Sequence, residues 1–280
     1  VALALWFHDA VYDPQAKDNE LKSAELFEQY LAQDLSIDIV QKIKRWIIAT
    51  QRHEATDELD LQFLLDIDLI KGTPKDLSAM LQANLLDMAA IPSIKYAQNY
   101  HDYMIMPDIS VSCDGEVKSI YLFSKVPIED LHHRKIALTN TSATSQALLR
   151  IIMARKYEAV PEYFDSIPEL RAMLMEADAA LLIGDDALRA KYKTSDSLYV
   201  YDLGQEWKDM TGLPMVFSVW AIRREFAENR LDQVKLIYDA FCDSMAYSLE
   251  NIEDVARKAS QWEDFPPEYL VEYFKTLRFD

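Results

Sequence analysis

The distribution of glycine and proline divides the sequence at Gly72. All five glycines lie at or after this residue, and residues 1–71 contain one proline, Pro14. The first segment therefore lacks the residues that most often end helices and form turns. Two apolar sets within it each share a helical face, namely Ala24, Phe27 and Leu31, and Ile39, Ile43 and Trp46. These patterns predict that residues 1–72 form an all-helical segment.

After Gly72, short apolar runs alternate with amphipathic stretches. The runs that have the length and composition of strands are 88–93, 119–124, 135–139, 179–184, 197–203 and 215–222. The stretches with helical periodicity are 76–86, 145–157, 168–176 and 186–192, and the pattern is helical again from residue 230. Strands separated by helices of this length indicate parallel sheets and an α/β fold.

Charge and composition exclude several classes of function. The formal net charge is −18 and no basic stripe is present, which argues against a nucleic acid or an anionic membrane as partner. No apolar run reaches the roughly 18 residues of a membrane span, and the first residues, VALALWFHDA, lack the positive charge that begins a signal peptide. Cys113 and Cys242 match no metal-binding spacing. We expect them to be reduced thiols of a cytoplasmic protein.

The stretch KIALTNTSATSQALLRII, residues 135–152, gives the strongest indication of a ligand site. A buried strand leads there into a helix whose beginning carries four hydroxyls, those of Thr141, Ser142, Thr144 and Ser145. The first N–H groups of a helix have no partner within it and carry partial positive charge. Hydroxyls added at this point make a binding place for a carboxylate or phosphate without a fixed cation. The alternative is ordinary N-capping, which needs only one hydroxyl.

Two further strand ends carry residues suited to binding. Ser93 directly follows the run MAAIP, and Gly184 and Asp185 lie between a predicted strand and a predicted helix. Asp185 could equally well cap that helix. Because ligands of open α/β sheets bind beyond the carboxyl ends of strands, the three strand ends together predict one cleft.

Five stretches after residue 72 match a known family in order and spacing: IPSIKYAQNY, SCDGEVKSIYLFSKVPIEDL, IALTNTSATSQALL, DAALLIGDDALR and YDLGQEWKDMTGLPMVFSVWAIRRE. Through them, residues 73–280 resemble the chorismate dehydratases of the futalosine route to menaquinone. The resemblance implies the two-lobed fold of type II periplasmic binding proteins, whose two α/β lobes close over a ligand. Residues 73–124 and 215–280 would form the first lobe, and residues 125–214 the second. We expect the aromatic residues near the end, which include Tyr269 and Tyr273, to pack a C-terminal helix on the first lobe.

The same resemblance implies a lyase that dehydrates chorismate to 3-[(1-carboxyvinyl)oxy]benzoate and needs no cofactor. The implied substrate-binding residues are Ser93, Ser119, Thr141, Ser142, Thr144, Ser145, Gly184 and Asp185. The four hydroxyls at the helix start would hold one carboxylate. Ser93 and Ser119 would line the opposite wall, and Gly184 with Asp185 would close the pocket.

The resemblance also shows a gap in the chemistry. The family begins with a strand whose asparagine faces the substrate, and no such stretch occurs in this sequence. The catalytic group is therefore unassigned. A strand missing from the interior of a sheet leaves backbone groups unpaired on both of its neighbours, so we expect an incomplete first lobe and impaired turnover.

A second resemblance concerns the start of the chain. WFHDAVYDP and IIATQRHEATDELDLQFLLDIDLIKG are similar to helices of the HD-type metal-dependent phosphohydrolases. This resemblance implies a divalent metal held by His8, Asp9 and Asp68, although the first metal-binding histidine of that family has no counterpart. The alternative is a structural helical fragment without a metal.

Three functions therefore stay open. The first is a lyase whose small-molecule partner is chorismate. The second is a non-catalytic protein of the same fold that binds a small carboxylate, which the missing asparagine favours. The third is a metal-dependent HD-type phosphohydrolase.

Overall fold

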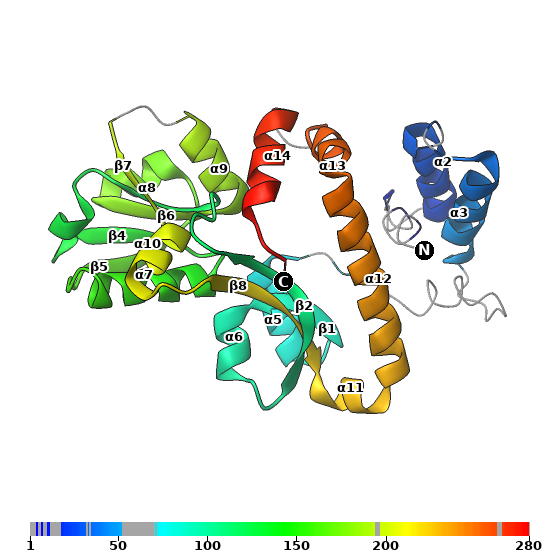
Figure 1. Ribbon diagram of the computed structural model, residues 1–280, viewed down its shortest axis with the longest axis horizontal. Coiled ribbons are helices and arrows are strands. Elements are labelled where there is room, and N and C mark those ends of the chain that lie inside the picture. Colours follow the sequence, from blue (N-terminus) through cyan, green and yellow to red (C-terminus); the bar gives the residue numbers. More distant parts are fainter. Residues whose placement is uncertain are drawn as a thin grey trace. The chain divides into compact units, whose positions relative to one another are not determined.

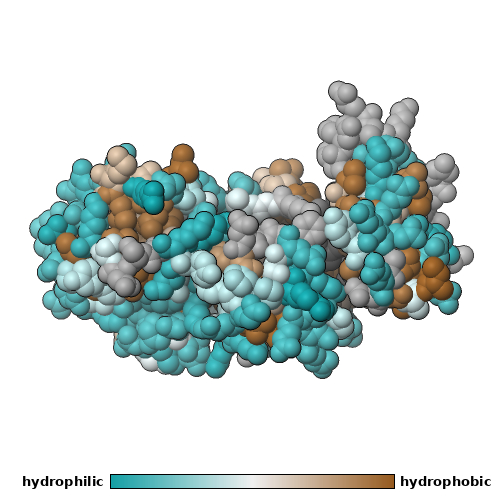
Figure 2. All heavy atoms as spheres, turned by 90° about the horizontal axis from the view of Figure 1, so that it is seen from above, coloured by the Kyte–Doolittle hydropathy of each residue, from teal (hydrophilic) through white to brown (hydrophobic). Residues whose placement is uncertain are grey.

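The computed structural model describes residues 4, 7, 10–11, 18–31, 33, 35–51, 70, 72–193, 197–261 and 265–279. The chain divides into two compact units, Val1–Lys71 and Gly72–Asp280. None of the helices in the described ranges combines the length and apolar character of a membrane span. Hydrophilic residues cover most of the described part of the face shown in Figure 2, in keeping with the net charge of −18.

In the first unit, the described residues form two helices that pack on each other. These are α2 (Asn19–Leu31) and α3 (Ile37–Ala49). Ala24 and Phe27 are buried between them as predicted. The predicted face of α3 is partly wrong, because Ile39 is 46% exposed. The buried face is centred between Ile43 and Ile47, which leaves Ile39 at its margin in the first turn.

The second unit contains two sheets (Figure 1). The three-stranded sheet has the order β1 (Met88–Pro92), β8 (Met215–Arg223), β2 (Tyr103–Cys113), and both pairings are antiparallel. Its accompanying helices are α5 (Pro74–Gln82), α6 (Ser93–Gln98), α11 (Arg224–Asn229) and α12 (Leu231–Glu250). We call this sheet with these helices the first lobe.

The five-stranded sheet has the order β5 (Glu162–Ser166), β4 (Lys135–Thr139), β6 (Ala179–Ile183), β3 (Ile120–Ser124), β7 (Tyr199–Asp202). Strand β4 is parallel to β5 and β6, but β3 is antiparallel to β6 and β7. The prediction of parallel sheets is therefore wrong for β3 and for the first lobe. The strands concerned are β3 and β8. Each follows a segment of the other lobe and is antiparallel to both of its neighbours. The accompanying helices are α7 (Ala143–Arg155), α8 (Leu170–Glu176), α9 (Gly184–Lys193) and α10 (Leu203–Thr211), and together they form the second lobe.

The second lobe has apolar layers on both faces of its sheet. Because strand side chains alternate between faces, Leu122 packs in a cluster with residues of α7 and α10. Its neighbour Phe123 packs with Met173 of α8 and Ala187 of α9. All five residues of β3 are buried, as expected for an interior strand covered on both sides.

The chain crosses between the lobes before β3 and again before β8. Because β3 belongs to the second lobe, the first crossing precedes Ile120, whereas the sequence placed residues up to 124 in the first lobe. Strand β2 of the first lobe ends at Cys113 and β3 pairs only with second-lobe strands, so the lobe boundary falls within residues 114–119. The return crossing precedes Met215, as β8 pairs only with first-lobe strands.

The chain ends in two helices, α13 (Ile252–Ala259) and α14 (Pro267–Thr276). The predicted packing of the last helix on the first lobe is wrong. Leu270 of α14 and Phe265, which precedes the helix, are buried and cluster with Leu188 of α9, which belongs to the second lobe. Beyond α14, Arg278 pairs with Ser112 of β2 in the first lobe. The C-terminal segment thus contacts both lobes.

Candidate functional site

All the predicted binding residues except Ser93 gather at one edge of the five-stranded sheet. The carboxyl ends of β4, β6 and β7 meet there, because these three strands run in the same direction. Strand β3 runs against them, so its amino end reaches the same edge and places Ser119 there. Thr139, Ile183 and Asp202 are the last residues of the other three strands.

The hydroxyls at the start of α7 form a hydrogen-bonded cluster. Ser142 is the N-cap residue, and its oxygen accepts a hydrogen bond of 3.2 Å from the N–H of Ser145. The hydroxyl of Ser142 donates to the Ser145 oxygen at 3.0 Å. One residue earlier, the hydroxyl oxygens of Thr141 and Thr139 lie 2.8 Å apart. Capping therefore accounts for Ser142, while the other hydroxyls exceed what a cap requires.

The two lobes touch at this cluster. The N–H of Ile94, in the first turn of α6, donates to the hydroxyl oxygen of Thr144 at 3.4 Å. Thr144 is buried, with 3% of its surface exposed. Next to Ile94, the hydroxyl of Ser93 donates to the carbonyl oxygen of Val216 in β8 at 2.7 Å. The hydroxyl-rich start of α7 therefore faces the first lobe.

Ser119, Gly184 and Asp185 form a second group at the same edge. The N–H of Gly184 donates to the carbonyl oxygen of Ser119 at 2.8 Å, and the Ser119 side chain is buried. Gly184 has a φ of +58°, a left-handed conformation that favours glycine. Asp185 is exposed in the first turn of α9, with Arg189 3.9 Å away on the same helix. Ser93 and Ser119 were predicted to line the same side of the pocket, opposite the hydroxyls of α7. The structure places them in different lobes, Ser93 in the first and Ser119 in the second.

Sequence reasoning missed Asp202, which organises the turn before Ser119. Its carboxylate accepts hydrogen bonds from the N–H groups of Val117 at 3.0 Å and Lys118 at 2.7 Å. It also caps α10 by accepting from Gly204 and Gln205. Burial raises the pKa of Asp202, and these amide hydrogen bonds lower it in part. An Asp between an apolar run and a helix is a capping signal that was present in YVYDLGQEW.

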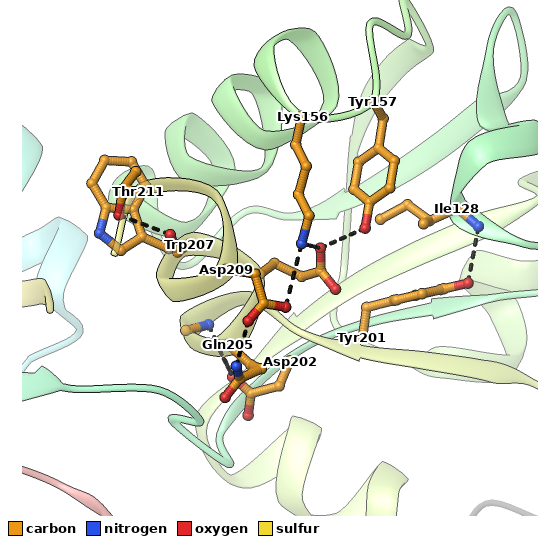
Figure 3. A network of polar contacts seen from close by, with 11 residues as sticks. Ile128, Lys156, Tyr157, Tyr201, Asp202, Gln205, Trp207, Asp209 and Thr211 are labelled. Atoms are coloured by element: carbon orange, nitrogen blue, oxygen red, sulfur yellow. Dashed lines mark hydrogen bonds and ion pairs between the residues drawn. The ribbon is translucent and has the colours of Figure 1, made fainter. Parts of the chain in front are cut away.

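A second polar network lies toward the other end of α7 (Figure 3). Lys156 and Tyr157 reach α10, where the Glu206 carboxylate accepts from the Lys156 ammonium at 2.8 Å and from the Tyr157 hydroxyl at 2.6 Å. Burial and the hydrogen bond to Glu206 raise the pKa of Tyr157 far above its ordinary value. This network joins α7 to α10 and contains none of the predicted binding residues.

The structure also has an open hollow of about 490 Å³ at the opposite edge of the five-stranded sheet. It is lined by Lys135, Glu162, Tyr163, Phe164 and Glu176. Two of these residues begin β4 and β5, so the hollow lies at the amino ends of the strands. It brings together none of the predicted binding residues.

The predicted metal ligands His8, Asp9 and Asp68 lie outside the described residues. Within the ranges that are described, no group of three or more His, Cys, Asp or Glu side chains is arranged to hold a metal ion. The HD-type metal site therefore stays a prediction.

Comparison with known proteins identifies relatives of the second unit. The model of a family described as menaquinone biosynthesis matches residues 55–280. The match begins before the boundary expected at residue 73, so Asp68 lies within it. The chain is 29% identical over 225 residues to a chorismate dehydratase of Thermus thermophilus, which covers 75% of this chain and 80% of that relative.

Solved structures show the same fold at low sequence identity. Protein AF1704 of Archaeoglobus fulgidus superimposes with a TM-score of 0.60 at 20% identity, covering 77% of this chain and 78% of that one. The periplasmic aliphatic sulphonate binding protein SsuA of Escherichia coli gives a TM-score of 0.53 at 17% identity, covering 74% and 70%. These similarities confirm the predicted fold of a periplasmic binding protein.

Proposed function

The chain belongs to the menaquinone biosynthesis family, and we propose that it is a chorismate dehydratase. The observation that carries this proposal is the 29% identity to the Thermus thermophilus chorismate dehydratase over most of both chains. The proposed reaction removes water from chorismate and gives 3-[(1-carboxyvinyl)oxy]benzoate.

This reaction makes modest demands on the protein. A ring C–H bond and the C–O bond of the neighbouring hydroxyl break, the ring gains a double bond, and the proton and hydroxide leave as water. No electrons pass to an acceptor, so we propose that side chains and backbone groups suffice without a metal or organic cofactor. The protein must orient the two carboxylates of chorismate and stabilise the departing hydroxide.

We assign one substrate carboxylate to the start of α7. Each hydroxyl can donate one hydrogen bond and accept others, so Thr144 can accept from Ile94 and still donate to a ligand. The hydrogen bonds between Ser142 and Ser145 hold both side chains in place before a ligand arrives. The helix start adds backbone N–H groups and partial positive charge. These features support carboxylate binding where the two lobes meet.

We assign the rest of the substrate to the second group and to Ser93. Gly184 and Asp185 follow β6, which adjoins β4 in the sheet, and Ser119 precedes β3 on the other side of β6, so all three lie at the same edge as the start of α7. Ser93 would approach from the first lobe. We assign no residue to removal of the ring proton.

The proposal is tested by turnover and by a double substitution at the start of α7. Purified protein should convert chorismate to the product, followed by absorbance and mass spectrometry. Replacing Ser142 and Thr144 together with alanine should weaken chorismate binding, because the ligand loses the Thr144 donor, at a cost of roughly 1–3 kcal/mol, and Ser145 loses the Ser142 hydroxyl that holds it in place. The matched control is Ser124→Ala, because Ser124 is a buried serine of the same sheet whose hydroxyl lies at the opposite edge and donates to Val126. Unaltered affinity in the double variant would contradict the assignment.

A binding protein without turnover is the second candidate, and the fold shared with the sulphonate binding protein SsuA favours it. Tight chorismate binding without any product would support this candidate over the lyase. An HD-type hydrolase stays a prediction for the first unit, and a rise in melting temperature with manganese would support it. Cytoplasmic location also stays a prediction, which the free thiols of Cys113 and Cys242 support.

A further inference from the structure

Thr139, the last residue of β4, belongs to the hydroxyl cluster at the start of α7 but was not among the predicted binding residues. It is fully buried, with 0% of its surface exposed. The hydroxyl oxygens of Thr139 and Thr141 lie 2.8 Å apart, and the N–H of Thr141 donates to the Thr139 hydroxyl oxygen at 3.4 Å. Within the described part of the chain, the Thr139 hydroxyl makes no other hydrogen bond. Its hydrogen-bonding partner there is therefore Thr141 alone.

Burial decides which of these two hydroxyls donates to the other. A hydroxyl carries one proton, and its oxygen can accept further hydrogen bonds. A buried proton without an acceptor costs free energy, and the acceptor that the Thr139 hydroxyl has within reach is the Thr141 oxygen. The Thr139 hydroxyl therefore donates to the hydroxyl oxygen of Thr141. The proton of the Thr141 hydroxyl is left to point away from Thr139.

The four predicted hydroxyls at the start of α7 are not equivalent. Thr141 and Ser142 are half-buried, whereas Thr144 and Ser145 are buried. The Ser142 hydroxyl donates to the Ser145 oxygen at 3.0 Å, so its proton is already engaged within the cluster. Of the two more accessible hydroxyls, the one whose proton is available to a ligand is therefore that of Thr141.

The backbone of Thr139 is held in place by α7. The side-chain amide of Gln146 donates to the Thr139 carbonyl oxygen at 2.8 Å and to the Asp165 carboxylate at 2.9 Å. Because Asp165 lies on β5, which pairs with β4, this amide joins the start of α7 to the ends of both strands. Thr139 therefore has a fixed position from which its hydroxyl can orient that of Thr141.

We propose that Thr139 is a positioning residue of the substrate site, which directs the proton of the Thr141 hydroxyl toward a substrate carboxylate. The inference rests on the proposed function, because it takes the start of α7 to bind that carboxylate. Thr139 acts through Thr141, whose oxygen it occupies with its own proton before a ligand arrives. A hydroxyl that is oriented in advance loses less rotational freedom when the ligand binds, and this strengthens binding.

The test is a double-mutant cycle between Thr139→Val and Thr141→Val. The probe is 3-[(1-carboxyvinyl)oxy]benzoate, whose Kd is measured by calorimetry because the product does not react during the titration. Valine keeps the branched shape of threonine and replaces only the hydroxyl. We expect T139V to raise the Kd about threefold to tenfold in the wild-type background, the effect of one lost hydrogen bond, and T141V to raise it at least as much. In the T141V background, T139V should change the Kd less than about twofold, because the hydroxyl on which Thr139 acts is already absent.

Two further variants separate orientation of the hydroxyl from packing. Thr139→Ser keeps the hydroxyl and removes the methyl group, so its Kd should stay within about twofold of the wild-type value. Ser124→Ala is the matched control and should leave the Kd unchanged. Ser124 is also a fully buried last residue of its strand, and its hydroxyl bonds to the residue two positions later, Val126. Melting temperatures show whether folding is intact, and T139A takes the place of T139V if the valine variant is too unstable to titrate.

The outcomes distinguish this inference from the proposed function. If wild-type protein binds the product but T139V binds it equally well, the inference alone is overturned. An equal rise in Kd in both backgrounds also overturns it, because Thr139 would then not act through Thr141. So does a T139S variant that binds as weakly as T139V, because packing would then explain the loss. If wild-type protein fails to bind the product, the proposed function and the inference fall together.

Discussion

The carboxylate of Asp202 lies 2.7 Å from the backbone nitrogen of Lys118, so a helix cap of the second lobe also fixes the turn that enters from the first lobe. Lys118 has a φ of +58°, a left-handed conformation that is costly for a lysine. The Asp202 hydrogen bonds offset that cost. The position of Ser119, one residue later, therefore depends on a residue at the end of another strand.

Replacing Asp202 with alanine should destabilise the protein by at least about 2 kcal/mol, because one helix loses its cap and two buried amides lose their acceptor. Urea unfolding followed by circular dichroism measures the loss. Asp209→Ala on the same helix is the control. It removes only exposed contacts with Lys156 and Gln205 and should change stability by less than about 1 kcal/mol. Equal losses in the two variants would mean that Asp202 has no special role at the crossing.

A substitution at Gly204 should also destabilise the segment where the chain passes from the first lobe to the second. A Cβ atom at this position would lie 2.5 Å from the carbonyl oxygen of Gly115 and 2.6 Å from the sulfur of Cys113. Gly204→Ala should therefore cost about 1–3 kcal/mol through overpacking, measured as a shift in the urea midpoint. Gly212→Ala tests the alternative cause, backbone strain. Gly212 has a φ of +73° and open space around it, so its variant should lose only about 1 kcal/mol. A larger loss in G212A than in G204A would contradict the steric argument.

Burial raises the pKa of Cys113 to about 11, with a further contribution from the Asp202 carboxylate. A raised pKa means less thiolate at a given pH, and thiolate is the reactive form. At pH 8 the two units above the ordinary value of 9.0 reduce the thiolate fraction about a hundredfold. Iodoacetamide should therefore label the half-buried Cys242 well before Cys113 in folded protein, as read by peptide mass spectrometry. In urea-unfolded protein, Cys113 and Cys242 should react at similar rates. Rapid labelling of Cys113 in folded protein would contradict the burial and raised pKa of its thiol.

Sequence patterns revealed the strands that contain continuous apolar runs. Such runs predicted β1, β3, β4, β6 and β8 within one residue and also included β7, and the runs are most nearly unbroken in the strands that are covered on both faces. Strands β2 and β5 were missed. The pairing of β2 with β8 shifts register between Ile105 and Ser110, where Pro107 and Asp108 interrupt the pattern, and β5 is a short edge strand with the sequence EYFDS. Asp108 has a φ of +55°, which no alternation of apolar residues reveals.

The sequence could also predict only some of the contacts among the binding residues. The hydroxyls at the start of α7 are consecutive in sequence, so their meeting could be predicted from the strand and helix around them. Ser119 reaches the same edge only because β3 runs antiparallel to its neighbours, and no local pattern encodes that direction. The C-terminal segment likewise returns to the second lobe, where Leu270 clusters with Leu188. The apolar spacing of Phe265, Tyr269 and Tyr273 indicates a helix face without indicating which surface it covers.

The two ends of α7 should have separable roles. The start of the helix carries the proposed carboxylate site, whereas Tyr157, just beyond its end, donates a 2.6 Å hydrogen bond to the Glu206 carboxylate. Tyr157→Phe should cost about 1.5–3 kcal/mol, the range for a hydrogen bond to a charged group, and should leave the KM for chorismate unchanged. Urea unfolding and initial rates measure the two quantities on the same preparation. Tyr199→Phe, whose side chain is 48% exposed, is the control and should alter neither. A raised KM in Y157F would show that the network at the end of α7 also affects substrate binding. The two ends of the helix would then not have separate roles.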